Sequence, residues 1–204
     1  MSTNDKPKCL NDLSIIISIF VDCDERITNL ERTLQYINHH FDVNIILSEL
    51  GEEPRLSDIP NVKHIFHKYT DLFNRQLGVN LGVKAADTPV IAHYDADILL
   101  HPKQITTAVK LIIDDKFDIV YPYDGKFYDV PEKYHSEISE SNSLDCINID
   151  DCTLFNPYSV GGVVFFDREK FWEGGGANEN FSGLGYEDNE LNWRYNMLSY
   201  RIAR

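Results

Sequence analysis

Two aspartates, Asp95 and Asp97, follow a short apolar segment, residues 90–94, that is typical of a buried strand. Side chains alternate along a strand, so His93 and both aspartates would face the same way if the strand continued that far. Carboxylate oxygens are the ligands that Mg²⁺ and Mn²⁺ prefer, often beside a diphosphate. The pair therefore predicts a metal site, although a lone Asp-x-Asp is also common in solvated turns, and His93 alone is interpreted as a packed strand residue.

A second acidic pair, Glu187 and Asp188, follows two glycines, Gly183 and Gly185. Glycine lets the backbone approach a ligand closely or adopt a positive φ. The two carboxylates would lie in the first turn of a helix, where the helix dipole favours negative charge. Acidic residues are common at helix starts, so this cluster indicates chemistry only together with the others.

A third group, Phe73, Asn74 and Arg75, lies early in a predicted helix that precedes the strand before Asp95. A guanidinium can bind phosphate oxygens through two parallel hydrogen bonds. The alternative is an ordinary surface arginine.

These groups need a scaffold, and the alternation of apolar and amphipathic segments predicts one. We predict strands at residues 13–21, 43–47, 62–67, 90–94, 117–121 and 160–166, and helices at 26–40, 70–86, 102–113, 168–172 and from about 187. The pattern indicates one α/β domain over 13–204, with a mainly parallel central sheet flanked by helices, after a polar segment at 1–12. Ligands of such sheets bind at the carboxyl edge, where Asp95 and Asp97 would lie.

Residues 122–158 interrupt this alternation, because they are rich in Asp, Ser, Asn and Tyr and show no sustained period. A long segment of this kind is typical of a functional lid or a disordered stretch. We expect it, with the loop at 174–176, to close over the site and exclude water.

Composition limits the partners. The chain has 204 residues and a net charge of −14, which argues against nucleic acid, because a polyanion is bound through Lys and Arg. A small phosphate-bearing ligand can still bind if a divalent cation and one or two arginines offset the repulsion.

The cysteines and the apolar run at 13–21 bear on the compartment. Cys9, Cys23, Cys146 and Cys152 lack zinc-ligand spacing and are predicted to be free thiols, with a Cys146–Cys152 disulfide as the alternative. The apolar run is too short to span a bilayer and its flanks are not those of a signal peptide. We expect a cytoplasmic protein without a transmembrane segment, which leaves room for peripheral association with a membrane.

Together, in this order and spacing, the three groups resemble the β-1,4-galactosyltransferase family and the related galactosyl and N-acetylgalactosaminyl transferase domains of chondroitin-type polymerases. Residues 73–83 followed by 95–97 resemble their Phe-Asn-Arg helix and metal-binding Asp-x-Asp strand. Residues 161–171 followed by 183–188 resemble their Gly-Gly strand and acidic glycine-rich loop. The likeness covers most of residues 13–200 and implies a GT-A fold.

The resemblance implies an inverting transferase that moves a hexose or N-acetylhexosamine, with galactose or N-acetylgalactosamine favoured. The donor would be a UDP-sugar, the acceptor a saccharide or glycan hydroxyl, and the ion Mn²⁺ or Mg²⁺. Asp95 and Asp97 would hold the metal, Asp188 would be the general base and Glu187 would bind sugar or acceptor hydroxyls. The donor would contact Arg26, Phe73, Arg75, Asp95, Gly183 and Gly185.

Two positions depart from the family pattern. The family commonly has a tryptophan in the glycine-rich loop, where this chain has Leu184, which affects the acceptor contact and the choice of sugar. The family also has a histidine metal ligand after the last helix, and no histidine follows His135 here. Either the chain is a shortened version of the family, or water completes the coordination of the metal.

Two other functions remain open. A nucleotidyltransferase that makes activated sugars would share the sheet and a metal-binding aspartate, but it normally needs a glycine-rich basic loop after the first strand. Residues 20–26 contain no glycine and are mostly acidic. A non-catalytic carbohydrate-binding paralogue is favoured by Leu184 and the missing histidine, and disfavoured by the intact Glu187 and Asp188.

Overall fold

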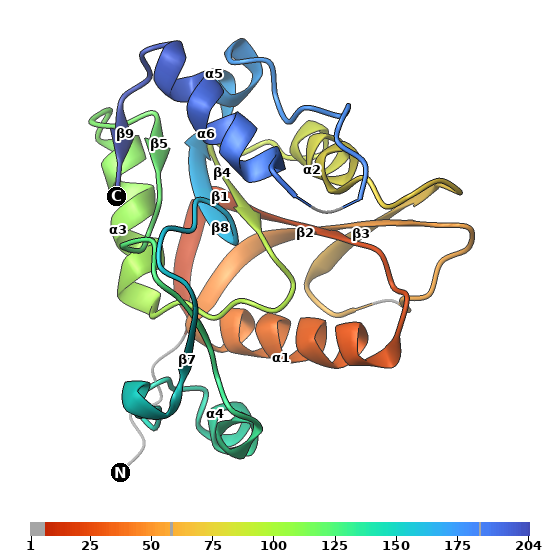
Figure 1. Cartoon of the computed structure of the whole chain (residues 1–204), viewed down its shortest axis with the longest axis vertical. Helices are drawn as coiled ribbons and strands as arrows, with labels where there is room; N and C mark the ends of the chain where they lie inside the picture. Colours follow the sequence, from red (N-terminus) through yellow and green to blue (C-terminus); the bar gives the residue numbers. More distant parts are fainter. Residues whose placement is uncertain (1–6, 58, 184) are drawn as a thin grey trace.

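The apolar, β-branched segments form the strands of a seven-stranded sheet (Figure 1). The structure is a computed structural model that describes residues 7–57, 59–183 and 185–204. The strands are β1 (Lys8–Ile19), β2 (Phe41–Gly51), β3 (Val62–Lys68), β4 (Val90–Tyr94), β5 (Ile119–Val120), β8 (Val163–Asp167) and β9 (Ile202–Ala203). Their order in the sheet is β3-β2-β1-β4-β8-β5-β9.

Most strand pairs in this sheet are parallel. β1 pairs in parallel with β2 and β4, β2 with β3, and β5 with β9, whereas β8 runs antiparallel to β4 and β5. The predicted mainly parallel α/β architecture is therefore confirmed. The antiparallel strand β8 lies directly beside β4, so the segment that leads into β8 approaches the end of β4 from which Asp95 emerges.

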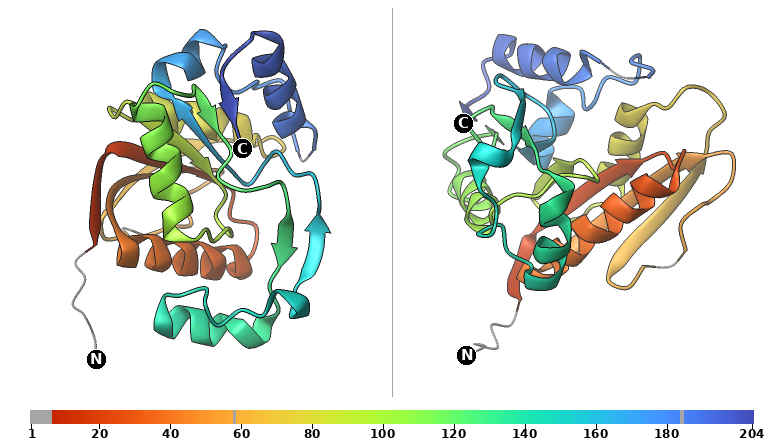
Figure 2. Two further views of the ribbon diagram at one scale, coloured as in Figure 1. Left: turned by 90° about the vertical axis from the view of Figure 1, so that its left-hand side faces the viewer. Right: turned by 60° about the horizontal axis from the view of Figure 1, so that its bottom comes forward.

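Helices cover both faces of the sheet (Figures 1 and 2). They are α1 (Asp24–His40), α2 (Arg75–Lys84), α3 (Pro102–Ile113), α5 (Arg168–Glu173) and α6 (Glu187–Met197). Alternate residues of β1 serve the two faces: Ile15 and Ile17 belong to the core shared with α1 and α3, and Ile16 belongs to the core shared with α2, α5 and α6.

The predicted starts of β1 and α2 differ most from the structure. β1 begins at Lys8 rather than near Leu13, because Lys8 and Cys9 pair with the start of β2 across an irregularity in the register. The predicted polar segment 1–12 is thus partly strand, and residues 1–6 lie outside the described residues. The helix predicted from Thr70 begins at Arg75, where the Asn74 side chain accepts a hydrogen bond from the Leu77 amide at 2.9 Å and caps the first turn.

Residues 122–158 contain more regular structure than predicted. β6 (Phe127–Asp129) and β7 (Thr153–Asn156) form an antiparallel hairpin, and between them lie α4 (His135–Ser141) and two 3₁₀ turns, η1 (Glu132–Tyr134) and η2 (Ile149–Asp151). The hairpin projects from the sheet and carries α4 beside α1 (Figure 2). The loop at 174–176, predicted to cover the site, instead ends α5 and is held by Arg194, which donates to the carbonyls of Gly174 and Gly176.

The predicted free thiols are confirmed, since all four cysteines, each within the described ranges, are unpaired. In the part of the chain that the structure describes, no helix is both long and apolar enough to cross a membrane.

Two glycines bring α2 unusually close to β1. Gly78 and Gly82 lie one turn apart on the buried side of the helix, and a methyl group at either position would overlap Ser18 or Ile16 of β1. The sequence showed only an imperfect apolar face here, because small residues rather than large ones make the contact. This close approach fixes the height of Arg75, the first residue of α2, above the sheet.

We predict that Gly82→Ala destabilises the protein by roughly 1–3 kcal/mol, because the new methyl group overpacks the contact with Ile16. The sign of the change in the free energy of unfolding is informative, because a Gly→Ala change at an open helix position stabilises a protein by up to about 1 kcal/mol. Urea unfolding measures the difference. Lys84→Ala, on the exposed side of the same helix, is the control and should stay within about 0.5 kcal/mol of wild type; an equally stable Gly82→Ala protein would contradict the close packing.

An ion pair between Asp118 and Arg201 docks the C-terminal strand β9. The Asp118 carboxylate accepts from the backbone amide and the guanidinium of Arg201, and the Arg201 carbonyl accepts from the Asp118 amide. The Arg201 guanidinium lowers the pKa of Asp118, which is almost fully buried.

We predict that Asp118→Asn lowers stability at neutral pH and that this difference disappears in acid. A lowered carboxylate pKa contributes stability above the unfolded pKa of about 3.9, and the contribution is lost as the pH falls through the folded value. Parallel thermal melts of the two proteins from pH 7 down to about pH 2 measure the effect, because the folded pKa lies below the unfolded one. A stability difference that stays constant over this range would show that the ion pair does not account for it.

Candidate active site

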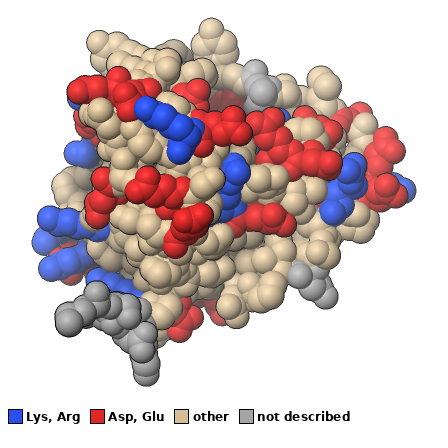
Figure 3. All heavy atoms as spheres, turned by 90° about the horizontal axis from the view of Figure 1, so that it is seen from below, with Lys and Arg blue, Asp and Glu red and all other residues tan. Residues whose placement is uncertain are grey.

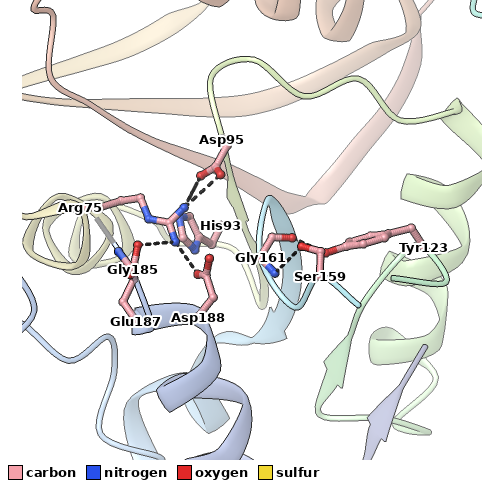
Figure 4. A network of polar contacts seen from close by, with 9 residues as sticks. All are labelled: Arg75, His93, Asp95, Tyr123, Ser159, Gly161, Gly185, Glu187 and Asp188. Atoms are coloured by element: carbon pink, nitrogen blue, oxygen red, sulfur yellow. Dashed lines mark hydrogen bonds and ion pairs between the residues drawn. The ribbon is translucent and has the colours of Figure 1, made fainter. Parts of the chain in front are cut away.

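The Arg75 guanidinium joins acidic groups from distant parts of the chain (Figure 4). Nη1 donates to both carboxylate oxygens of Asp95, at 2.8 and 3.0 Å. Nη2 donates to Asp188 and lies 3.2 Å from Oε1 of Glu187. The Arg75 side chain is only 11% exposed. Asp95 follows β4 and the two other carboxylates begin α6, so the arginine lies where the two predicted acidic clusters meet.

Arg75 and the surrounding carboxylates shift one another's pKa values. Burial opposes the charge of Arg75, but Asp95, Asp188 and Glu187 outweigh it and the pKa of Arg75 is raised. Burial also raises the pKa of Asp188, and the nearby Arg75 only partly counteracts that effect. A carboxylate with a raised pKa binds a proton more readily, which suits a general base.

His93 is a packed strand residue, as the sequence indicated, and its ring lies beside this cluster (Figure 4). Its ring is buried at the end of β4, and Nε2 is 3.6 Å from an Asp95 oxygen without a hydrogen-bond partner among the described residues. Burial first, and then the charge of Arg75, lower the pKa of His93 to about 3. The imidazole is therefore neutral at physiological pH and does not form an ion pair with Asp95.

Asp95 and Asp97 fit a divalent cation by their chemistry and position. β4 ends at Tyr94, so a turn rather than a continued strand brings both aspartates to the same cavity. Burial is the larger cause of the raised pKa of Asp97, and the charge of Asp95 adds to it; a cation beside both carboxylates would oppose both effects. No cluster of three or more His, Cys, Asp or Glu side chains suited to a metal occurs among the described residues. A metal here would depend on donor phosphates and water for its other ligands, as Mg²⁺ and Mn²⁺ commonly do.

The glycine-rich loop is held against α2. The Gly183 amide donates to the Phe73 carbonyl at 2.9 Å, and the Gly185 amide donates to Glu187 Oε2 at 2.8 Å. Both glycines have positive φ values, 80° and 121°, and a side chain at either position would meet open space. The glycines are therefore required by backbone conformation, and the open space allows a ligand to approach. Leu184 lies outside the described residues.

The remaining predicted donor residues, Phe73 and Arg26, lie apart from the ion-pair cluster. The Phe73 ring stacks on Phe20 at the end of β1, with ring centroids 5.8 Å apart. Arg26 pairs with Asp22 at 2.6 Å, and both side chains are about half exposed. The charge of Asp97 contributes to the raised pKa of Arg26, although hydrogen bonding to Asp22 is the larger cause.

Gly161, just before β8, belongs to the predicted Gly-Gly strand, but the sequence assigned it no role in the site. A methyl group at Gly161 would overlap the Asp188 carboxylate. Its carbonyl accepts from the Tyr123 hydroxyl, and its amide donates to Ser159 Oγ at 3.2 Å (Figure 4). The glycine thus leaves room for the acidic side chain, and the network of Tyr123 and Ser159 fixes the backbone there. The pair of glycines at 161–162 before an apolar strand was the available signal.

Comparisons with known proteins bear on the family and the fold. Residues 146–204 match the family model described as the N-terminal domain of galactosyltransferase, so the resemblance to that family is confirmed over this part. No curated protein sequence matches the chain.

Among solved structures, the catalytic domain of Drosophila β1,4-galactosyltransferase 7 in complex with xylobiose has a TM-score of 0.58 at 16% identity. A mutant of that enzyme in complex with manganese, UDP-Gal and xylobiose gives the same values. Each match covers 96% of this chain and 65% of the other. A mannosyltransferase from Pyrobaculum calidifontis in complex with GDP-Man and Mn²⁺ has a TM-score of 0.52 at 14% identity, over 94% of this chain and 54% of that one.

The chain has a GT-A glycosyltransferase fold. It is similar to part of each of these proteins, spanning less than two thirds of their length. In the GT-A fold of this chain, Asp95 and Asp97 come from the turn after β4, and Glu187 and Asp188 come from the N-terminus of α6.

We predict that Gly161→Ala displaces the Asp188 carboxylate while leaving the fold intact. If Asp188 is the base of a transfer reaction, such a misplacement should lower kcat by about a hundredfold with little change in the affinity for UDP. Steady-state kinetics and UDP titration measure the two effects. An unchanged kcat in Gly161→Ala, or a loss that appears only in the affinity for UDP, would show that the glycine does not act through Asp188.

Proposed function

We propose that this chain is a metal-dependent, inverting glycosyltransferase that moves a sugar from a UDP-sugar donor to a hydroxyl of a saccharide or glycan acceptor. The observation that carries the proposal is that the buried Arg75 guanidinium contacts both Asp95 and Asp188. Asp97 lies two residues beyond Asp95 in the same turn. An acidic protein can bind a diphosphate only if positive charge is gathered locally. Three carboxylates oppose the charge of Arg75, so the positive charge for a diphosphate would come from Arg75 together with a metal ion on Asp95 and Asp97.

The donor side of the proposed site has separate groups for the diphosphate and the nucleotide. Asp95 and Asp97 would hold Mn²⁺ or Mg²⁺, whose chemistry is to stabilise the negative charge that develops on the departing diphosphate. Arg75 would bind phosphate oxygens through its guanidinium, and Arg26 would face the nucleotide from the start of α1. Phe73 would offer a ring beside Phe20, and the backbone at Gly183 and Gly185 would lie close to the donor.

The proposed reaction is a single displacement. The oxygen of the acceptor hydroxyl forms a bond to the anomeric carbon as the bond from that carbon to the diphosphate oxygen breaks, and UDP leaves with the bonding electrons. Asp188 accepts the hydroxyl proton, and Glu187, held by Arg75 and the Gly185 amide, would orient sugar or acceptor hydroxyls. One displacement at one carbon inverts its configuration.

The sugar is proposed to be a hexose or N-acetylhexosamine, with galactose or N-acetylgalactosamine favoured. Support comes from the match of residues 146–204 to a galactosyltransferase model, and from the Drosophila structure described with UDP-Gal. The reaction would serve polysaccharide biosynthesis, and we propose that it takes place in the cytoplasm. The proposed partners do not include nucleic acid, and the protein would be able to bind peripherally to a membrane.

We predict that Asp188→Asn abolishes sugar transfer but preserves binding of UDP with Mn²⁺. Asparagine keeps the shape of the side chain and cannot take the proton. Asp95 and Glu187 still pair with Arg75 in this variant, so the protein should remain folded. Transfer from radiolabelled UDP-Gal and UDP-GalNAc to a panel of acceptors, together with thermal shift on adding UDP and Mn²⁺, measures the outcome.

Glu190→Gln is the matched control, because Glu190 is another carboxylate of α6 but pairs with Arg194 away from the cluster. It should retain transfer. Full transfer by Asp188→Asn would exclude Asp188 as the base. Release of pyrophosphate from UTP and a sugar phosphate by the wild-type protein would instead indicate a nucleotidyltransferase.

A further inference from the structure

A large cleft leads from the candidate active site along α1 to α4. Its volume is about 1160 Å³, and it is lined by one side of α1, by the turn after β4 and by the segment from Tyr123 to Gly161. Asp95, Asp97 and Gly161 form its inner end, and Gly161 contacts Asp188. We call this cavity the α1 cleft. A pocket for one small ligand typically measures about 300–1,000 Å³, so the α1 cleft has more room than a single sugar ring needs.

The two walls of the α1 cleft differ in chemistry. The hairpin side offers aromatic rings, with Phe127 and Phe155 packed at a centroid distance of 6.0 Å. Phe155 is 75% exposed, although a phenylalanine on a monomeric surface is normally covered. The α1 side offers polar groups, including Asn29 and Arg32. Apolar ring faces on one side and hydrogen-bonding groups on the other suit a carbohydrate chain, whose sugars present both.

The cleft is held open at a fixed width. Gln35 of α1 donates to the Ser139 carbonyl of α4 at 2.7 Å, and His40 lies 2.8 Å from the Asn142 carbonyl. Arg32 lies 3.3 Å from the His135 ring. These contacts join α1 to α4 at the far end of the cleft, as the adjacent helices in Figure 2 illustrate, so a ligand would meet a preformed groove.

Charge narrows the class of ligand. Beyond the metal-binding turn, the lining of the α1 cleft includes Glu25, Asp129 and Glu132 against two basic residues, Arg32 and Lys126. Acidic side chains also predominate on the face seen from below in Figure 3. Like charges repel in such a groove, so an uncharged chain is favoured over one that carries carboxylates or phosphates.

We infer that the α1 cleft binds an extended, uncharged oligosaccharide acceptor, with the reacting sugar at Asp188 and the preceding sugars between α1 and the β6–β7 hairpin. This inference rests on the proposed transferase function. It gives the segment 122–158 a role as an acceptor wall in place of the lid that the sequence suggested.

The test is a glycan array that carries neutral oligosaccharides of one to six sugars and uronic-acid-containing chains of the same lengths, probed with the protein in UDP and Mn²⁺. We expect binding to neutral chains of three or more sugars, weak binding to single sugars, and weak binding to acidic chains. Equal binding of single sugars and longer chains, stronger binding of acidic chains, or no binding to any neutral oligosaccharide would overturn the inference.

Phe155→Ala should weaken binding of the longer neutral chains by about three- to tenfold, the range for loss of an aromatic contact. Trp193→Ala is the matched control, because Trp193 is a similarly exposed aromatic on α6 outside the cleft lining. Neither change should alter the thermal shift produced by UDP and Mn²⁺. A smaller shift in Phe155→Ala alone would mean that the cleft holds the donor, and the inference would be wrong. The absence of any shift in wild type would refute the proposed function itself.

Discussion

The need to pair one buried positive charge organises this site. A guanidinium withdrawn from water is costly unless carboxylates surround it, and Arg75 is surrounded by Asp95, Glu187 and Asp188. Asp95 lies near the middle of the sequence, and Glu187 and Asp188 lie near its C-terminal end. Satisfying the arginine therefore requires the turn after β4 and the start of α6 to meet, and that meeting creates the reaction site that we propose.

The contacts of α2 fix the position of Arg75 in the fold. Gly78 and Gly82 let α2 lie close to β1, and Asn74 caps the helix and donates to the Glu179 carbonyl of the loop that leads to α6. Asn80 holds the same loop through both the amide and the carbonyl of Ala177. One short helix thus fixes both the Arg75 guanidinium and the backbone that carries the acidic residues, and its buried side combines glycines and Asn80 with the core residues Val79 and Val83.

The sequence was sufficient for features that depend on local pattern. Unbroken apolar segments predicted the strands, and the Asp95, Asp97, Glu187 and Asp188 clusters were found from residue type and spacing. It was less informative where the determinant is a contact between distant residues. The start of α2 depends on Asn74 and not on Thr70, and β1 extends to Lys8 because β2 pairs with it there. The role of Gly161 is visible only in the structure, where Asp188 packs against it. The polar segment 122–158 carried no period because its strands β6 and β7 are very short and pair with each other, and its one short helix α4 lies against α1.

A crystal structure of the protein with Mn²⁺ and UDP, with the metal located by its anomalous signal, tests the central claim most directly. We expect the ion on the carboxylates of Asp95 and Asp97, and the Arg75 guanidinium on a phosphate oxygen with Asp188 in the same cavity. A metal bound away from these aspartates, or a diphosphate that does not contact Arg75, would contradict it.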